Sequence, residues 1–258
     1  MTDLFWLAAA SFAASLITFF SGFGLGTILT PVMMLFFPAE LAVAATGLVH
    51  LSNNFFKLIL TGKNASADVL LRFAVPAILA AVLGSWLMLR IPDSQPLFTH
   101  YAFGSQSLVY PLKFLIGLLL ILFALLELIP FFSRLEFPKK FLPLGGFLSG
   151  FFGGLAGVQG ALRTAFLIRA GLSKEAFIAT AVVASTLVDL TRLSIYASAV
   201  EIRGGLLDSP VIWVGIAAAI AGAALGNQLL KKVTVRTMQV FIAGMLILMG
   251  MALASGLV

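Results

Sequence analysis

Two glycine-rich stretches decide the fold: SGFGLGTILTPVMMLFFP at residues 21–38 and GGLAGVQGALRTAFLIRA at residues 153–170. Each stretch divides a run of apolar residues into two short segments, and the four segments are 4–20, 22–37, 141–153 and 157–170. They are shorter than the roughly 20 residues that a helix needs to cross a bilayer. Each pair therefore predicts either one broken membrane span or a helical hairpin that returns to the side where it began.

The composition of the whole chain places these segments in a membrane. Of its 258 residues, 61% are hydrophobic and 10% are charged, whereas a soluble domain averages about 45–50% apolar and about 25% charged residues. A water-soluble core would not hide this much apolar surface, so most of it faces lipid. The apolar runs are continuous, without the alternation of a barrel strand, and predict an all-α integral membrane protein.

Several other classes of protein are excluded. The chain has no Cys, which excludes a disulfide scaffold and thiol chemistry. Its two His and the lack of clustered carboxylates predict no metal site and no cofactor. The net charge of +6 is carried largely by short loops between apolar runs, which is typical of cytoplasmic loops and not of a nucleic-acid surface.

Longer apolar runs supply the remaining spans, and the loop charges indicate their orientation. The runs long enough to cross alone lie at about 40–61, 68–90, 108–131, 174–199, 209–230 and 234–257. If both short pairs are hairpins, ten loop Lys and Arg fall on one side and three on the other; if each is one span, the division is six to seven. The positive-inside rule favours hairpins, with both termini outside the cytoplasm.

The chain also repeats itself weakly. At an offset of 135 residues Gly22 falls on Gly157, Glu40 on Glu175, Asn54 on Asp189 and Lys57 on Arg192. We therefore predict a first membrane repeat at 1–131, a connecting loop at 132–140 and a second repeat at 141–258. Each repeat would be a Gly-tipped hairpin plus three transmembrane helices, so the second repeat would be inverted, as in many secondary transporters.

The two tips are the first candidate binding elements. A helix that begins after each tip presents free N–H groups and a partial positive charge, and two such starts that converge would suit an anion. The predicted tip residues are Gly24, Gly26, Thr27, Gln159, Gly160 and Ala161. The alternative is that these glycines only allow close helix packing.

Ionisable residues inside the apolar runs are the second candidate. Arg163 follows the second tip closely, at a depth in the membrane where a charge is costly. It is therefore either a functional residue or an arginine that caps carbonyl groups of a neighbouring helix. Ser185, Asp189, Arg192 and Tyr196 share one helix face, which should point into the bundle. Arg192 can bind an anion together with Arg163, or Asp189 and Arg192 form a neutralised structural pair.

The equivalent face of 40–61 carries Thr46, His50, Asn53 and Lys57. Lys57 either lines the site or extends its ammonium to the cytoplasmic surface. His50 is either a proton relay or a packing residue. Asn53, with Asn54 beside it, either lines the cavity or bridges helices.

The sequence resembles the TauE/SafE family of membrane permeases, also called the 4-toluene sulfonate uptake permease family. In that family a Gly-rich turn leads to a Pro and then to a helix that opens with Ala and Thr. Gly22, Gly24, Gly26, Pro31 and Ala44-Ala45-Thr46 match this pattern in the first copy, and Gly157, Gly160 and Ala179-Thr180 match it in the second. This sequence departs from the pattern at Gln159 and Phe166, the positions where the second copy in the family often has Gly and has the Pro. The resemblance implies transport of sulfite, thiosulfate or organosulfonates across the bacterial inner membrane.

From these observations we expect a secondary transporter of a small anion, working by alternating access, and not an enzyme. Its partners would be the anionic substrate, the lipid bilayer and a coupling proton or sodium ion. The chain has no Walker motif, so ATP is not its direct energy source. An anion channel and a membrane-embedded enzyme without transport are the alternatives.

Overall fold

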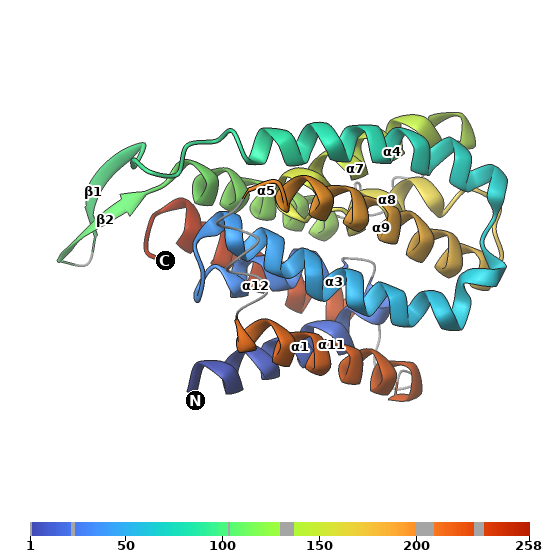
Figure 1. Cartoon of the computed structure of the whole chain (residues 1–258), viewed down its shortest axis with the longest axis horizontal. Helices are drawn as coiled ribbons and strands as arrows, with labels where there is room; N and C mark the ends of the chain where they lie inside the picture. The colour runs from blue at the N-terminus through green and yellow to red at the C-terminus, as the bar shows by residue number, and fades with distance from the viewer. Residues whose placement is uncertain (1, 22–23, 103, 130–136, 200–208, 230–234) are drawn as a thin grey trace.

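The computed structural model describes the whole chain apart from residues 1, 22–23, 103, 130–136, 200–208 and 230–234, and it is mainly helical (Figure 1). Its α-helices, in chain order, are α1 (Thr2–Ser21), α2 (Leu25–Met33), α3 (Ala39–Thr61), α4 (Ala67–Met88), α5 (Pro111–Leu128), α7 (Leu142–Ala156), α8 (Gly160–Leu167), α9 (Lys174–Tyr196), α11 (Pro210–Leu229) and α12 (Val235–Ala254). Two 3-10 turns, η1 (Gly62–Asn64) and η2 (Lys139–Phe141), precede α4 and α7. Much of the predicted connecting loop 132–140 lies outside the described residues, as do Arg203, Lys231 and Lys232.

Both glycine-rich stretches separate a pair of helices, as predicted. Gly24, directly before α2, has φ +82°, and Gly157, directly after α7, has φ +76°. Glycine adopts this left-handed conformation without the steric cost that a Cβ brings. The helices that follow are shorter than the predicted segments, with 9 residues in α2 and 8 in α8.

The helices have the apolar character expected in a membrane. Among the described residues, α4 and α9 are each long and apolar enough to cross a bilayer alone, and α1, α5, α11 and α12 contain shorter apolar stretches. Many large apolar side chains point outward: Leu71, Leu79, Phe241 and Leu248 each expose about two thirds of their surface. Such exposure is unfavourable in water and is expected for surface that faces lipid.

A row of glycines joins α7 to α4. Gly146, Gly150 and Gly154 lie four residues apart on one face of α7, and a Cβ on each would overlap the backbone of α4 at the carbonyls of Phe73, Ala77 and Ala81 in that order. The two helices therefore run parallel with their backbones in contact, which is the small-residue packing typical of membrane helices.

Helix α1 packs on α11 in the same manner. A Cβ at Gly222 would meet Phe12 and Ser15, and one at Gly215 would meet Leu7 and Ser11. These two helices also run parallel. Figure 1 shows α1 and α11 side by side, on the opposite side of α3 and α9 from α4 and α7.

Two other pairs run antiparallel. On α5 and α12, Gly117 lies against Gly250 and Ala254, while Gly250 also lies against Ile121. On α3 and α9, Gly47 lies against Arg192 and Leu193, while His50 bonds to Asp189. In both pairs, the residue numbers at successive contacts rise along one helix and fall along the other.

The connection between α4 and α5 contains a β-hairpin. Strands β1 (Phe98–Ala102) and β2 (Ser105–Val109) pair antiparallel and project from one end of the helices (Figure 1). The hairpin is fixed to the C-terminal end of α12, because His100 Nε2 hydrogen-bonds the carbonyl oxygen of Ser255 at 2.8 Å. The all-α prediction is therefore correct for the membrane helices and incomplete outside them.

Candidate functional site

The two glycine-rich tips lie against each other inside the bundle. A Cβ on Gly24 would lie 3.3 Å from Gly160 Cα, and a Cβ on Gly26 would lie 2.6 Å from the carbonyl oxygen of Gly157. Gly26 and Gly160 are buried. The two tips are therefore in backbone contact, and this contact leaves no room for a side chain at Gly26.

A cavity of about 840 Å³ lies beside these tips, between α1, α2, α3, α8, α9 and α12. Three of its lining residues are cationic, Lys57, Arg163 and Lys174, and none of the described residues that line it is Asp or Glu. Its polar uncharged lining consists of Thr18, His50, Asn54, Thr61, Thr164, Ser185 and Gln239. The cavity is therefore positively charged.

The cavity extends from one end of the helices to their middle. Thr61 ends α3 and Lys174 begins α9, whereas His50 and Ser185 lie at the midpoints of the same two helices. Gly24 and Leu25 of the first tip line the cavity as well. The inner end of the cavity thus lies where the first tip meets α3 and α9.

Arg163 is held at this inner end by α9. Its Nη1 donates a hydrogen bond to Ser185 Oγ, and its buried Nε has no hydrogen-bond partner among the described residues. The short helix α8 begins at Gly160, so Arg163 lies in its first turn, close to the contact of the two tips. A buried guanidinium N–H without an acceptor is costly, which makes Arg163 a candidate donor to an anionic ligand.

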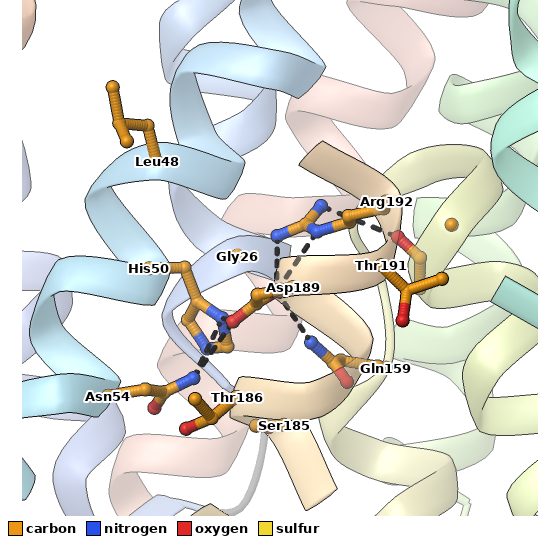
Figure 2. Close-up of polar contacts among 12 residues, drawn as sticks. Gly26, Leu48, His50, Asn54, Gln159, Ser185, Thr186, Asp189, Thr191 and Arg192 are labelled. Atoms are coloured by element: carbon orange, nitrogen blue, oxygen red, sulfur yellow. Dashed lines mark hydrogen bonds and ion pairs between the residues drawn. The ribbon is translucent and has the colours of Figure 1, made fainter. Parts of the chain in front are cut away.

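Asp189 is the centre of a buried hydrogen-bond network (Figure 2). Its Oδ2 accepts from His50 Nδ1 at 2.6 Å and from Asn54 Nδ2 at 2.9 Å. Its Oδ1 accepts from Arg192 Nε at 2.9 Å and from Gln159 Nε2 at 3.2 Å. The side chain of Asp189 is fully buried, and four donors from α3, α9 and the second tip satisfy it. The carboxylate therefore joins the helix faces that meet at the inner end of the cavity.

Arg192 and Tyr196 connect α9 to the end of α7. Arg192 pairs with Asp189, with its Nη2 2.8 Å from Oδ1, and its Nη1 donates to the carbonyl oxygen of Gly153 at 3.4 Å. Tyr196 donates its hydroxyl hydrogen to the carbonyl oxygen of Gly154. Both side chains are fully buried. Tyr196 thus satisfies a carbonyl group in the last turn of α7, where the helix itself leaves carbonyls without partners, whereas the Gly153 carbonyl also accepts the backbone N–H of Gly157 at 3.0 Å.

The predicted site residues divide into those at the cavity and those behind it. Arg163, Lys57 and Gly24 line the cavity. Asp189, Arg192 and Gln159 form the network behind His50, while Gly26, Thr27 and Gly160 are buried around the contact of the tips. Asn53 is fully buried and its Oδ1 accepts from Ser15 Oγ at 3.4 Å, so it bridges α3 to α1. Ala161 is half-buried and does not line the cavity.

Two predictions about helix faces are confirmed. Ser185, Asp189, Arg192 and Tyr196 all point into the bundle and are buried. Asp189 and Arg192 form an internal pair, which was the alternative to an anion site shared by Arg192 and Arg163. Of the equivalent face on α3, Thr46, His50 and Asn53 are buried and Lys57 is half-buried in the cavity wall.

Sequence reasoning missed the part that Lys174 plays. Lys174 is one of the ten loop Lys and Arg that the positive-inside rule assigns to the cytoplasmic side, and it also lines the cavity together with Ile178, Ala181 and Ser185. These four residues are spaced at 4, 3 and 4 along α9, which places them on one helix face. The spacing alone would have identified Lys174. Thr18 and Gln239 also line the cavity, and no pattern in the sequence indicates them.

Taken together, the exposed apolar helices, the two broken helix pairs and the buried cationic cavity define a helical membrane protein built around an internal binding space. The family model described as "Sulfite exporter TauE/SafE" matches residues 7–253. The chain belongs to this family, which is a family of multi-pass membrane transporters and not of enzymes. Neither the curated proteins nor the solved structures contain a match to this chain.

Proposed function

We propose that this chain is a secondary transporter of a sulfur oxyanion or an organosulfonate, such as sulfite, across the bacterial inner membrane. The substrate binds at the inner end of the cavity, next to Arg163 and Lys57. The cavity carries the proposal, because its lining includes three cationic side chains and no described acidic one. An anion that enters such a space is stabilised by the charges and replaces part of its lost hydration with N–H donors.

The distribution of partners around the two central arginines supports this assignment of the site. Arg192 has its charge balanced by Asp189 and is separated from the cavity, so it orders the network. Arg163 bonds to an uncharged serine hydroxyl and retains a buried N–H without a described acceptor. Arg192 Nη2 also makes no hydrogen bond to a described residue, but it lies 2.8 Å from the Asp189 carboxylate, away from the cavity lining. Arg163, which lines the cavity and has no paired acid, is therefore the side chain that gains most from an anionic ligand.

The packing of the helices supports two inverted repeats, α1–α5 and α7–α12, that move against each other. Under the offset of 135 residues, α3 corresponds to α9, and the corresponding residues Asn54 and Asp189 bond to each other at 2.9 Å. The pair α4 and α7 has its counterpart in α11 and α1. Corresponding helices that run antiparallel, as α3 and α9 do, are expected when a twofold axis in the membrane plane relates the repeats.

The described cavity then represents one of the two states of an alternating-access cycle. Its mouth lies at Thr61 and Lys174, next to the loops that carry most of the basic residues and that the positive-inside rule assigns to the cytoplasm. Arg192 and Tyr196 hold the end of α7 on the other side of the network. This state is therefore open to the cytoplasm.

Purified protein in liposomes tests the proposed function. We expect uptake of labelled sulfite and methanesulfonate that saturates with concentration, and no comparable uptake of chloride, because the cavity offers several donors to an oxyanion. Saturable exchange distinguishes a carrier from a channel, which conducts without saturating. Uptake that rises linearly with concentration, or no uptake of any of the three anions above protein-free liposomes, contradicts the proposal.

The orientation is tested with single cysteines, since the chain has none of its own. Asn64→Cys lies in η1 and Gln106→Cys in the β-hairpin, which are at opposite ends of the helices (Figure 1), and both positions are exposed. We expect a membrane-impermeant maleimide to label Gln106→Cys in intact spheroplasts and Asn64→Cys only after permeabilisation. The reverse pattern would place both termini in the cytoplasm, and the cavity would then open to the outside.

A further inference from the structure

We propose that His50 is the proton-binding residue of this transporter, and that one anion in the cavity and one proton on His50 Nε2 are carried together. This inference rests on the proposed function and deepens it by naming the coupling ion. The position of His50 between the cavity and Asp189 carries it: the residue lines the cavity and is joined through its Nδ1 to a fully buried carboxylate.

The hydrogen bonds of His50 fix which nitrogen carries the hydrogen of the neutral ring. Nδ1 lies 2.6 Å from Asp189 Oδ2. An ionised carboxylate only accepts hydrogen bonds, so Nδ1 is the donor in this contact. Asn54 Nδ2 lies 3.2 Å from the same Nδ1, and with the hydrogen on Nδ1 it donates to Asp189 Oδ2 instead, at 2.9 Å. Nε2 has no hydrogen-bond partner among the described residues. In the neutral ring Nε2 therefore presents a lone pair, and in the protonated ring it presents an N–H.

This difference couples the proton to the anion. A lone pair at the inner end of the cavity repels an anion, whereas an N–H on a charged ring donates to it. Without the anion, a charged His50 would add a third positive charge to an end of the cavity that Arg163 and Lys57 already occupy. Each ligand therefore favours the binding of the other, and by linkage the coupling is equal in both directions.

The charged groups around His50 fit this assignment. Asp189 on α9 is the only acid with a described contact to it, and Arg192 occupies the other oxygen of that carboxylate. Arg163 on α8 and Lys57 on its own helix line the same cavity. Helices α2 and α11, which also pack on α3, carry no ionisable residue. The remaining charges on α3 and its neighbouring elements lie at helix ends or in turns: Glu40 in the first turn of α3, Lys174 and Glu175 in the first turn of α9, Lys63 in η1, and Lys113 and Glu127 in the first and last turns of α5. The carried proton is thus assigned to His50, the ring that lies between the cavity and the Asp189 carboxylate.

The experiment uses the full chain in liposomes that contain a pH-sensitive dye, with methanesulfonate and sulfite as parallel probes. For the unmodified protein, an inward proton gradient should drive accumulation of the anion, and about one proton should enter with each methanesulfonate. His50→Gln keeps a permanent N–H donor without a titrating ring. We expect it to lose accumulation driven by the proton gradient, while exchange of labelled for unlabelled anion continues at a reduced but measurable rate, because the side chain at this position also contacts the anion. Sulfite itself binds and releases protons, and this contribution to the dye signal is the same for both proteins. The difference between the two signals therefore reports the proton that the protein carries.

His100→Gln is the matched control, because it changes the other histidine of the chain, which lies in β1 against Ser255. It should keep both exchange and proton-driven accumulation. Anion transport by the unmodified protein without proton entry would overturn the assignment of His50 and leave the proposed function intact, and this measurement does not depend on the folding of any variant. Undiminished proton-driven accumulation by His50→Gln would also overturn it. Absence of anion movement under every condition would instead refute the proposed function and this inference with it.

Discussion

Replacement of Arg163 by alanine is expected to lower the rate of sulfite and methanesulfonate uptake at low concentration by about 10- to 100-fold. A hydrogen bond to a charged group contributes about 1.5–3 kcal/mol, and each 1.4 kcal/mol is about tenfold in affinity. Arg163 lies at the inner end of the cavity with a buried N–H that no described residue accepts. Initial uptake rates in liposomes over a range of concentrations would measure the effect.

Two further variants make this result specific. Arg163→Lys keeps the charge without the forked donors of the guanidinium, and we expect an intermediate loss of uptake. Arg72→Ala removes the same charge from an exposed pair with Asp68 on α4, far from the cavity lining, and should leave uptake unchanged. Full saturable uptake by Arg163→Ala would show that the anion binds elsewhere.

Substitution of Gly150 by valine is expected to destabilise the protein more than any change in the cavity. A Cβ at this position would overlap the carbonyl group of Ala77, because the backbones of α4 and α7 are in contact. The helices would have to separate, and overpacking of this kind costs about 1–3 kcal/mol or more. We expect the melting temperature of the detergent-solubilised protein to fall by about 5–10 °C. Fluorescence-detected size exclusion after heating would measure it.

Gly244→Val on α12 is the matched control for this change. Nothing lies within 4 Å of a Cβ at Gly244, so the same substitution meets open space there. Both variants place a β-branched residue inside a helix and share its intrinsic cost. The difference between their melting temperatures therefore measures the clash between helices. Equal melting temperatures would mean that α4 and α7 are not in contact at Gly150.

The helices and their breaks were predictable from the sequence because lipid imposes simple requirements. A helix in a bilayer needs a continuous apolar run, and backbone that leaves the helix needs residues such as Gly24 and Gly157 that adopt positive φ. The β-hairpin was not predictable on these grounds. Strands β1 and β2 lie almost wholly outside the apolar runs. The contact that fixes the hairpin to α12 joins His100 to Ser255, which is 155 residues away in the chain.

The candidate site was predictable in its residue types and not in its connections. The spacing on α9 placed Ser185, Asp189 and Arg192 on an inward face, which the structure confirms. The spacing does not reveal that Asp189 bonds to His50 and Asn54, because that contact depends on where α3 and α9 cross. For the same reason, Arg163 and Arg192 were grouped together, although Asp189 pairs with Arg192 and the cavity reaches only Arg163.

The pairing of α1 with α11, two helices that are far apart in the chain, has a consequence for biosynthesis. Helix α1 leaves the ribosome about 190 residues before its parallel neighbour α11. The face of α1 with Ser11 and Ser15, on which the glycines of α11 pack, is therefore exposed to lipid while the middle of the protein is made. A chain truncated before α11 would leave the N-terminal helix without its partner, so such products should be recognised by membrane proteases and degraded.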